Sequence, residues 1–314
     1  MSGVLDAAVL DRLPPVRPAQ ADALAAAALR RFSPKLVVLD DDPTGVQTVH
    51  GVSVYTDWSR ETLLQGLRED GRLFFVLTNS RSLTPAATEA LHRTLAHNLA
   101  AAGRAAGREA VLLSRGDSTL RGHWPLETET LRQTLEAEGL PPFDGEILLP
   151  CFPEGGRCTL GNVHEVREGA QLLPVGETEF ARDGAFGYAA SDLPGWCQEK
   201  SGGRWPADGV CCIPVEQLRA LDVSGVTKRL LAVKNFEKVA VNAADYADVK
   251  VFCAGLLHAM AAGKHFLFRS AAALPKVLGG VPDRPLLTRE ELGLTGAGTR
   301  GLVVVGSHVE KTTR

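Results

Sequence analysis

Short apolar segments, separated by longer amphipathic ones, recur along most of the chain. Several are apolar at nearly every position instead of at every second one, as in KLVVLD (35–40) and RLFFVLT (72–78). Continuous apolar runs of this length are typical of strands buried on both faces of a parallel sheet. The complete set of expected strands is 35–40, 51–56, 72–78, 110–115, 146–150, 210–214, 238–242, 265–269 and 301–306.

The segments between these strands have the length and composition of helices. Residues 85–105, 125–138 and 245–262 are the clearest, and the Ala-rich segment 18–31 predicts a further helix before the first strand. Strands that alternate with helices predict an α/β fold with a doubly wound, mostly parallel sheet in three α/β/α layers.

Two stretches break the alternation. Residues 151–209 are rich in Gly, Pro and aromatic residues, and so long an insertion is typical of a functional element. Residues 279–301 resemble a connector, after which a new apolar strand runs into Gly306-Ser307. We therefore predict an N-terminal helical extension (1–32), a main domain (33–285), and a linker with the first strand of a truncated second α/β domain (286–314).

Composition narrows the class of protein. The 314 residues carry a net charge of -3, which gives no basic surface for nucleic acid. No apolar stretch reaches the length of a membrane span, and the N-terminus lacks the basic start and apolar run of a secretory signal. The six cysteines have no framework spacing, so we expect buried free thiols and a cytoplasmic protein.

Dense polar sets follow four of the expected strands. They are Asp40–Gly45, Thr78–Ser82, Ser114–Gly122 and Pro150–Arg157. In open α/β sheets, ligands bind beyond the carboxyl ends of the strands. We therefore expect these four segments to form one site.

The first set contains three consecutive aspartates, Asp40, Asp41 and Asp42. Mutual repulsion can raise the pKa of one of them, which would suit a general base. Carboxylate oxygens are also ligands for Mg²⁺. The structural alternative is a helix cap with a Pro-containing turn, but three acids exceed what a cap needs.

The other sets contribute arginines, namely Arg81, Arg115, Arg121 and Arg157. A guanidinium group binds a carboxylate or phosphate as a two-pronged fork. Any one of these arginines, taken alone, is more simply a surface ion pair. Four on one rim, facing an aspartate cluster, indicate a small anionic ligand with hydroxyl groups.

Two other groupings have simpler structural interpretations. Cys151, Cys158 and His164 match no common zinc spacing, so core thiols are the better interpretation. Aromatic residues of the insertion, such as Phe180, are expected to pack within it more often than to line a pocket.

The ordered combination DDDPTG (40–45), NSRS (79–82), RGDSTLRG (115–122) and PCFPEGGR (150–157) resembles the four-carbon acid sugar kinases. This family was once of unknown function and is also labelled type III effector Hrp-dependent outer protein. The resemblance implies an N-terminal domain that binds the sugar acid and a C-terminal domain that binds ATP. The implied reaction is phosphorylation of threonate, erythronate or 3-oxo-tetronates, with ATP and Mg²⁺ as cofactors.

The resemblance also implies roles for individual residues. Asp41, Arg81 and the segment from Arg115 to Ser118 would contact the sugar acid, and Ser307 would contact ATP. Combined with the strand-end pattern, it leads us to predict Asp41 and Asp42 as catalytic residues. The predicted substrate-binding set is Asp40, Asp41, Thr44, Arg81, Arg115, Asp117, Ser118, Arg121 and Arg157. The ligands of a metal ion stay unassigned.

Two other classes of function remain open from the sequence. One is a non-catalytic effector or sensor that uses the same pocket to bind a sugar acid. The other is a metal-dependent lyase or aldolase that uses the aspartates, although no histidine lies beside them. In each case the partner is a small anionic molecule rather than nucleic acid or a membrane. A homodimer is also left open.

We expect the 314-residue chain alone neither to hydrolyse ATP nor to transfer phosphate from it, because the expected glycine-rich ATP loops do not occur in this sequence. A coupled assay for ADP release, with and without four-carbon acids, checks this. Turnover above the no-enzyme rate would contradict the assignment of the ATP site to a separate domain.

Overall fold

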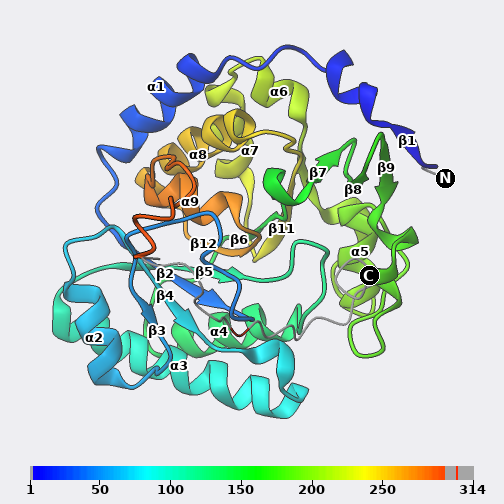
Figure 1. Cartoon of the computed structure of the whole chain (residues 1–314). Helices are drawn as coiled ribbons and strands as arrows, with labels where there is room; N and C mark the ends of the chain where they lie inside the picture. Colours follow the sequence, from blue (N-terminus) through cyan, green and yellow to red (C-terminus); the bar gives the residue numbers. More distant parts are fainter. Residues whose placement is uncertain (1–2, 294–301, 303–314) are drawn as a thin grey trace. The chain divides into compact units, whose positions relative to one another are not determined.

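A computed structural model describes residues 3–293 and residue 302 (Figure 1). The chain divides into two compact units, Met1–Val281 and Pro282–Arg314. All helices and strands found among the described residues belong to the first unit. The predicted strand at 301–306, apart from Leu302, lies outside the described residues.

Eight parallel strands form the central sheet, in the order β10-β11-β6-β12-β5-β2-β4-β3. The prediction of a mostly parallel sheet is confirmed. The strand predicted at 51–56 is reduced to two residues, because it lies at the sheet edge and pairs with β4 alone. The strands are β2 (Lys35–Asp40), β3 (Val54–Tyr55), β4 (Leu73–Leu77), β5 (Ala110–Arg115), β6 (Gly145–Leu149), β10 (Cys211–Ile213), β11 (Glu237–Val241) and β12 (Phe266–Ser270).

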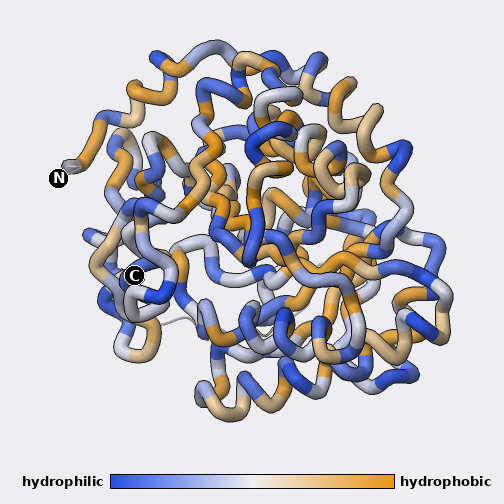
Figure 2. The backbone as a smooth tube through the Cα atoms, turned by 180° about the vertical axis from the view of Figure 1, so that it is seen from behind, coloured by the Kyte–Doolittle hydropathy of each residue, from blue (hydrophilic) through white to orange (hydrophobic). Residues whose placement is uncertain are grey.

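Helices cover both faces of this sheet, which confirms the three-layer prediction (Figure 1). Leu36 and Val38 of β2 pack into one core with α1, α6, α7, α8 and α9, and Val37 and Leu39 pack into another with α2, α3 and α4. Hydrophobic positions accordingly run through the central strands in Figure 2. The helices are α1 (Pro18–Leu29), α2 (Arg60–Arg68), α3 (Pro85–Ala106), α4 (Leu126–Ala137), α5 (Leu193–Lys200), α6 (Val215–Arg219), α7 (Val223–Ala232), α8 (Tyr246–Ala261) and α9 (Ala273–Gly279).

The helix ends follow ordinary capping chemistry. Thr84 caps α3 with its hydroxyl, Pro85 occupies the first turn, and Gly107 ends the helix with a φ of 59°. Asp245 and Asp248 form a reciprocal capping box at the start of α8. Among the described residues, no helix has the length and apolar character needed to cross a membrane.

A second, antiparallel sheet lies largely within the insertion, where the sequence predicted no strands. Its order is β1-β9-β8-β7, with β1 (Leu5–Asp6), β7 (Arg157–Leu160), β8 (Val163–Glu168) and β9 (Gln171–Pro174). The hairpins turn at Gly161-Asn162 and at Gly169, all with positive φ. The N-terminal extension is therefore not purely helical, because β1 pairs with β9.

The insertion also contributes a core of its own against the central sheet. Trp196 of α5 stacks on Trp124, and both lie in the same buried cluster as Leu148 of β6. All six cysteines are free; Cys151, Cys158, Cys197 and Cys253 are buried, whereas Cys211 and Cys212 are half-buried. The expectation of free thiols holds, with burial incomplete for the adjacent pair.

A fully buried ion pair joins β6 to β11 beneath this insertion. The Lys238 Nζ lies 2.7 Å from a carboxylate oxygen of Glu146, in a geometry too bent for a hydrogen bond, and both side chains are inaccessible to solvent. Trp124 donates a hydrogen bond to Glu146, and the ammonium group lies over the rings of Phe236 and Trp205, 3.7 and 4.0 Å from their centres. The aromatic rings offset part of the cost of burying the ammonium group.

Replacing Lys238 by Met leaves the Glu146 carboxylate buried without its cation. We expect the free energy of unfolding to fall by about 3–5 kcal/mol. The matched control is Lys250→Met, because Lys250 pairs with Asp22 on the surface, and its loss is expected to cost less than about 1 kcal/mol. Urea unfolding of both variants measures the difference. An equal loss of unfolding free energy in the two variants would contradict the prediction that the buried pair stabilises the fold more than the surface pair.

Candidate functional site

The carboxyl edge of the sheet gathers the predicted site residues. The strands that lead to them are β2, β4, β5 and β6, which lie in the stretch β6-β12-β5-β2-β4 of the sheet, so the segments that follow them share one edge. The edge receives Asp41 and Asp42 after β2, Arg81 after β4, and Asp117 after β5. The strand-end rule therefore places these residues together.

Arg81 is the centre of this cluster. Its Nε and Nη2 donate to the two oxygens of Asp41, the former at 3.1 Å, and its Nη1 donates to Asp42 at 2.6 Å. The same Nη1 lies 3.9 Å from Asp117. The backbone amide of Arg81 also donates to the carbonyl of Asp41 at 3.1 Å, which ties the β4 loop to the β2 loop.

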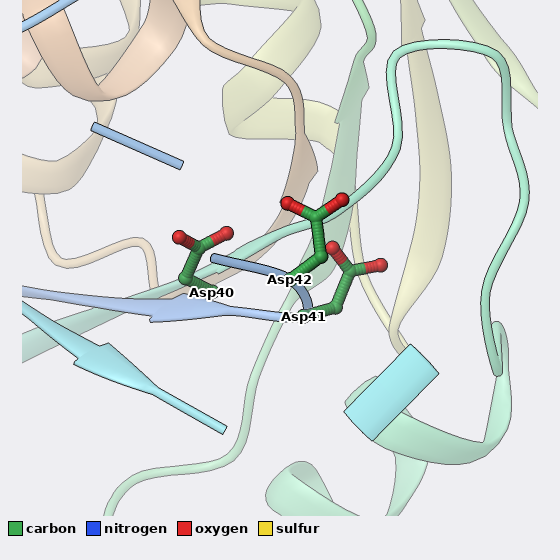
Figure 3. A group of neighbouring side chains, drawn as sticks. All are labelled: Asp40, Asp41 and Asp42. Atoms are coloured by element: carbon green, nitrogen blue, oxygen red, sulfur yellow. The ribbon is translucent and has the colours of Figure 1, made fainter. Parts of the chain in front are cut away.

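The three aspartate side chains follow one another at the end of β2 (Figure 3), but their electrostatic environments differ sharply. Burial raises the pKa of Asp40 to about 7, against the opposing charge of Arg115 and with the support of Asp41 and Asp42. Burial likewise raises the pKa of Asp41 although Arg81 opposes it. For Asp42, burial is outweighed by Arg81 and Thr44, and its pKa is lowered. The triplet thus contains an ionised acid, Asp42, next to an acid that is partly protonated near neutral pH, Asp40.

Arg115 and Thr44 fix the outer acids of the triplet. The Arg115 Nη1 lies 3.4 Å from Asp40 and 3.7 Å from Asp42, with the side chain almost fully buried. Thr44 donates to Asp42 from both its amide and its hydroxyl, at 2.9 and 2.5 Å. Thr44 therefore closes an Asx turn of the kind considered as the structural alternative.

Asp117 and Arg121 form a second pair on the same edge. The Arg121 Nε donates to Asp117 at 2.7 Å, and Thr119 donates its hydroxyl to the same carboxylate. Burial would raise the pKa of Asp117, but Arg81 and Arg121 hold it well below its ordinary value. Asp117 is therefore a permanent anion between two guanidinium groups.

The insertion covers this second pair. Phe180 carries the guanidinium groups of Arg121 and Arg157 on its ring, at 5.1 and 5.6 Å from the ring centre. Asp183 approaches Arg121 to 3.7 Å. Phe180 thus contacts site residues, a role that the sequence pattern ranked below packing.

Arg157 and Ser118 have different surroundings from the other predicted residues. Arg157 donates to the carbonyl of Gly155, and its buried Nε has no hydrogen-bond partner. Burial lowers the pKa of Arg157, partly offset by Asp117. The backbone carbonyl of Ser118 accepts a hydrogen bond from His164 at 2.7 Å, so this segment also joins the loop after β5 to β8.

Arg269 of β12 belongs to the same cluster, although the sequence reasoning did not select it. It is 4% exposed, it donates to the carbonyl of Arg121 at 2.5 Å, and its Nη1 lies 4.0 Å from Asp41 without a hydrogen-bond partner. A Cβ atom on Gly116 would stand 1.2 Å from that Nη1, which explains the glycine. The strand-end rule would have found Arg269, because it precedes the last residue of β12.

A second unselected residue, the acid Glu127 of α4, lies next to the cluster. It accepts a hydrogen bond from Ser80 at 2.6 Å and lies 4.0 Å from His92. Burial would raise the pKa of Glu127, but His92 and Arg269 lower it. Its second carboxylate oxygen is buried without a partner. Nothing in the helical pattern of this segment distinguished Glu127 from a surface acid.

The three aspartates offer oxygen atoms of the kind that bind a divalent cation, but these oxygens are already paired with arginines. Asp40, Asp41 and Asp42 each place a carboxylate oxygen within 4.8 Å of the others. Among the described residues, this is the group of three or more His, Cys, Asp or Glu side chains that lie close enough together to hold a metal ion. Arg81 and Arg115 already neutralise these carboxylates. Mg²⁺ could bind these oxygens only by displacing the guanidinium groups.

The zinc alternative lacks a free histidine nitrogen. His164 donates from Nε2 to Ser118 and accepts at Nδ1 from Thr159, and burial lowers its pKa to about 4. Both ring nitrogens are therefore used. Ser307, the predicted ATP contact, lies outside the described residues and stays a prediction.

Solved structures with the same fold come from several bacteria. The chain aligns with a protein of the DUF1537 family from Bordetella bronchiseptica, solved with bound citrate as a domain-swapped dimer, with a TM-score of 0.57 and 22% identity over 78% of this chain. It also aligns with a Salmonella typhimurium LT2 protein described as a candidate tRNA synthase (TM-score 0.53, 13% identity, 79% of this chain). A DUF1537 protein from Haemophilus influenzae gives a TM-score of 0.52 and 15% identity over 77% of this chain.

The alignments cover 55% of each of these three proteins, so this chain spans about half their length. No curated protein matches the sequence. A family model described as a sugar-binding N-terminal domain matches residues 36–278, which include all of the clustered acids and arginines. The chain therefore belongs to the family of sugar-binding N-terminal domains.

Proposed function

We propose that this chain supplies the substrate-binding part of an ATP-dependent kinase that phosphorylates a four-carbon sugar acid. The observation that carries the proposal is the ring of five arginines around buried aspartates at the carboxyl edge of the sheet. The family description as sugar-binding supports it, and so does the citrate bound to the Bordetella protein, since citrate is a hydroxy acid.

Arg157 is the best-placed group for the carboxylate of the substrate. The carboxylates of Asp41, Asp42 and Asp117 already balance the charges of Arg81 and Arg121. Arg157 is half-buried, forms no ion pair with the described residues, and has an unpartnered Nε. A substrate carboxylate would supply the missing anion with charge-assisted hydrogen bonds.

The aspartates suit the hydroxyl groups of the substrate. In phosphoryl transfer the protein mainly positions the reactants and balances charge, and a carboxylate orients the attacking hydroxyl. Asp41 lies between Arg81 and Arg269, and its raised pKa favours acceptance of a proton. Asp42 keeps its charge and holds Arg81 in place. The phosphate donor would bind to the part of the kinase that follows this domain.

The first test is binding of threonate and erythronate, followed by calorimetry and by thermal unfolding. We expect both acids to raise the melting temperature. Arg157→Gln should weaken binding by about 10- to 150-fold, because one charged hydrogen bond is worth about 1.5–3 kcal/mol. The variant breaks no ion pair between described residues, but it removes the hydrogen bond to Gly155 and the contact with Phe180, so its melting temperature without ligand is measured alongside.

The matched control is Arg93→Gln, which removes an exposed arginine paired with Glu89 on α3. It should bind both acids as the unchanged protein does. If neither acid binds, or if Arg157→Gln binds them equally well, the proposed substrate site is wrong.

A second test concerns the protonation of Asp40. Its ordinary pKa is 3.8 and its pKa in the folded chain is about 7, so only the folded state holds the proton between these values. Asp40 therefore makes the protein lose stability as the pH rises from about 4 to about 7. Asp40→Asn should remove this loss, and its advantage over the unchanged protein should grow by about 1–4 kcal/mol across that range.

Urea unfolding at pH 5 and pH 8 measures this difference. Glu165→Gln is a useful companion, since burial raises the pKa of Glu165 to about 7 as well, away from the arginine cluster. A stability difference between Asp40→Asn and the unchanged protein that does not vary with pH would show that Asp40 is ionised in the folded state.

A further inference from the structure

The central sheet opens at its amino edge between β5 and β12. These two strands pair only through Phe268–Ser270 against Leu113–Arg115, close to their carboxyl ends. Towards the amino end, β12 stays paired with β6 from Phe266 onward, and β5 stays paired with β2 from Ala110 onward. The two middle strands therefore diverge, and their amino halves leave a gap in the sheet.

A cavity of about 600 Å³ occupies this gap. Its volume falls within the usual range of pockets for small organic ligands, about 300–1,000 Å³. Both helical layers contribute to the wall, which is mostly apolar. Its apolar lining includes Leu99, Val111, Leu112, Leu135, Leu257 and Phe266.

Cations predominate among the charged residues that line the cavity. Arg31, Arg104, Arg108 and Lys264 line it, and the acid among the lining residues is Glu109. Arg104 pairs with Glu138 and Lys264 with Asp144. Arg108 donates to the carbonyls of Leu67 and Glu69. Arg31 is exposed to solvent, and we take its end of the cavity as the mouth. Neither Arg31 nor Arg108 pairs with a carboxylate in the described part of the chain, so these two cations outnumber the lining acid Glu109.

We propose that this cavity is a second binding site, for a small organic anion with an apolar body and one carboxylate. The hydrocarbon part would replace water along the leucine wall, and the carboxylate would face Arg31 and Arg108 at the mouth. The site is separate from the sugar-acid site, because β5 and β12 carry Arg115 and Arg269 at their opposite ends. A hydroxylated four-carbon acid is too polar for this wall.

Gly103 of α3 offers a way to fill the cavity without disturbing the fold. It lines the cavity, and a Cβ atom there would meet only the carbonyl of Arg108, at an ordinary 3.5 Å. Gly103→Leu should occupy the apolar space, and Gly103→Ala is the matched control because it adds the same Cβ but little volume. Both replacements favour the helix, since glycine is a poor helix former.

The experiment is calorimetric titration with octanoate, with 1-octanol as the neutral probe of equal length. We expect saturable binding of octanoate at one site and weaker binding of 1-octanol. Gly103→Leu should weaken octanoate by at least about tenfold, whereas Gly103→Ala should change it by less than about twofold. Arg31→Gln should weaken octanoate by about two- to fivefold and leave 1-octanol unchanged.

Arg157→Gln separates this proposal from the sugar-acid site, because it should bind octanoate normally. Three results would overturn the proposal: no saturable binding of octanoate, equal affinity for 1-octanol, or undiminished binding by Gly103→Leu. Loss of octanoate binding in Arg157→Gln would likewise show that octanoate occupies the opposite edge. None of these results bears on whether threonate binds.

Discussion

Charge compensation by Arg81 is the interaction on which the carboxyl edge of the sheet depends. One guanidinium group joins Asp41 and Asp42 after β2 to the loop after β4, and it faces Asp117 after β5. Without it, one buried and two half-buried carboxylates would repel one another at the end of the sheet. The pairing therefore holds three strand ends in one arrangement before any ligand arrives.

The same compensation determines which groups remain for an anionic ligand. An arginine that is already paired with an aspartate attracts an anionic ligand only weakly. Arg157 is paired with no aspartate among the described residues, and the Nη1 of Arg269 has no hydrogen-bond partner. The insertion matters here because Phe180 supports both Arg121 and Arg157. Arg157 is the first residue of β7, so the antiparallel sheet positions part of the candidate site, and the pairing of β1 with β9 attaches the N-terminal segment to the same sheet.

Most of the central sheet could be predicted from apolar runs, and most of the site from the residues that follow them. The pattern failed where structure depends on distant pairing. Strand β1 exists only because it pairs with β9, and β3 is short because it has one neighbour. Arg269 also lies at the carboxyl end of a strand, but it was not among the predicted site residues. Which aspartate is ionised depends on burial and on arginine rotamers, and the opening between β5 and β12 depends on register, so neither could be read from the residues.

The central claim is that a sugar acid binds at the carboxyl edge, with its carboxylate on Arg157 and its hydroxyls on the aspartates. A crystal structure of the chain with threonate tests it most directly. The account predicts the carboxylate within hydrogen-bonding distance of Arg157, a hydroxyl against Asp41 or Asp42, and the Arg81 pairs preserved. Threonate bound away from this edge, or bound there with its carboxylate on none of the arginines, would contradict the account.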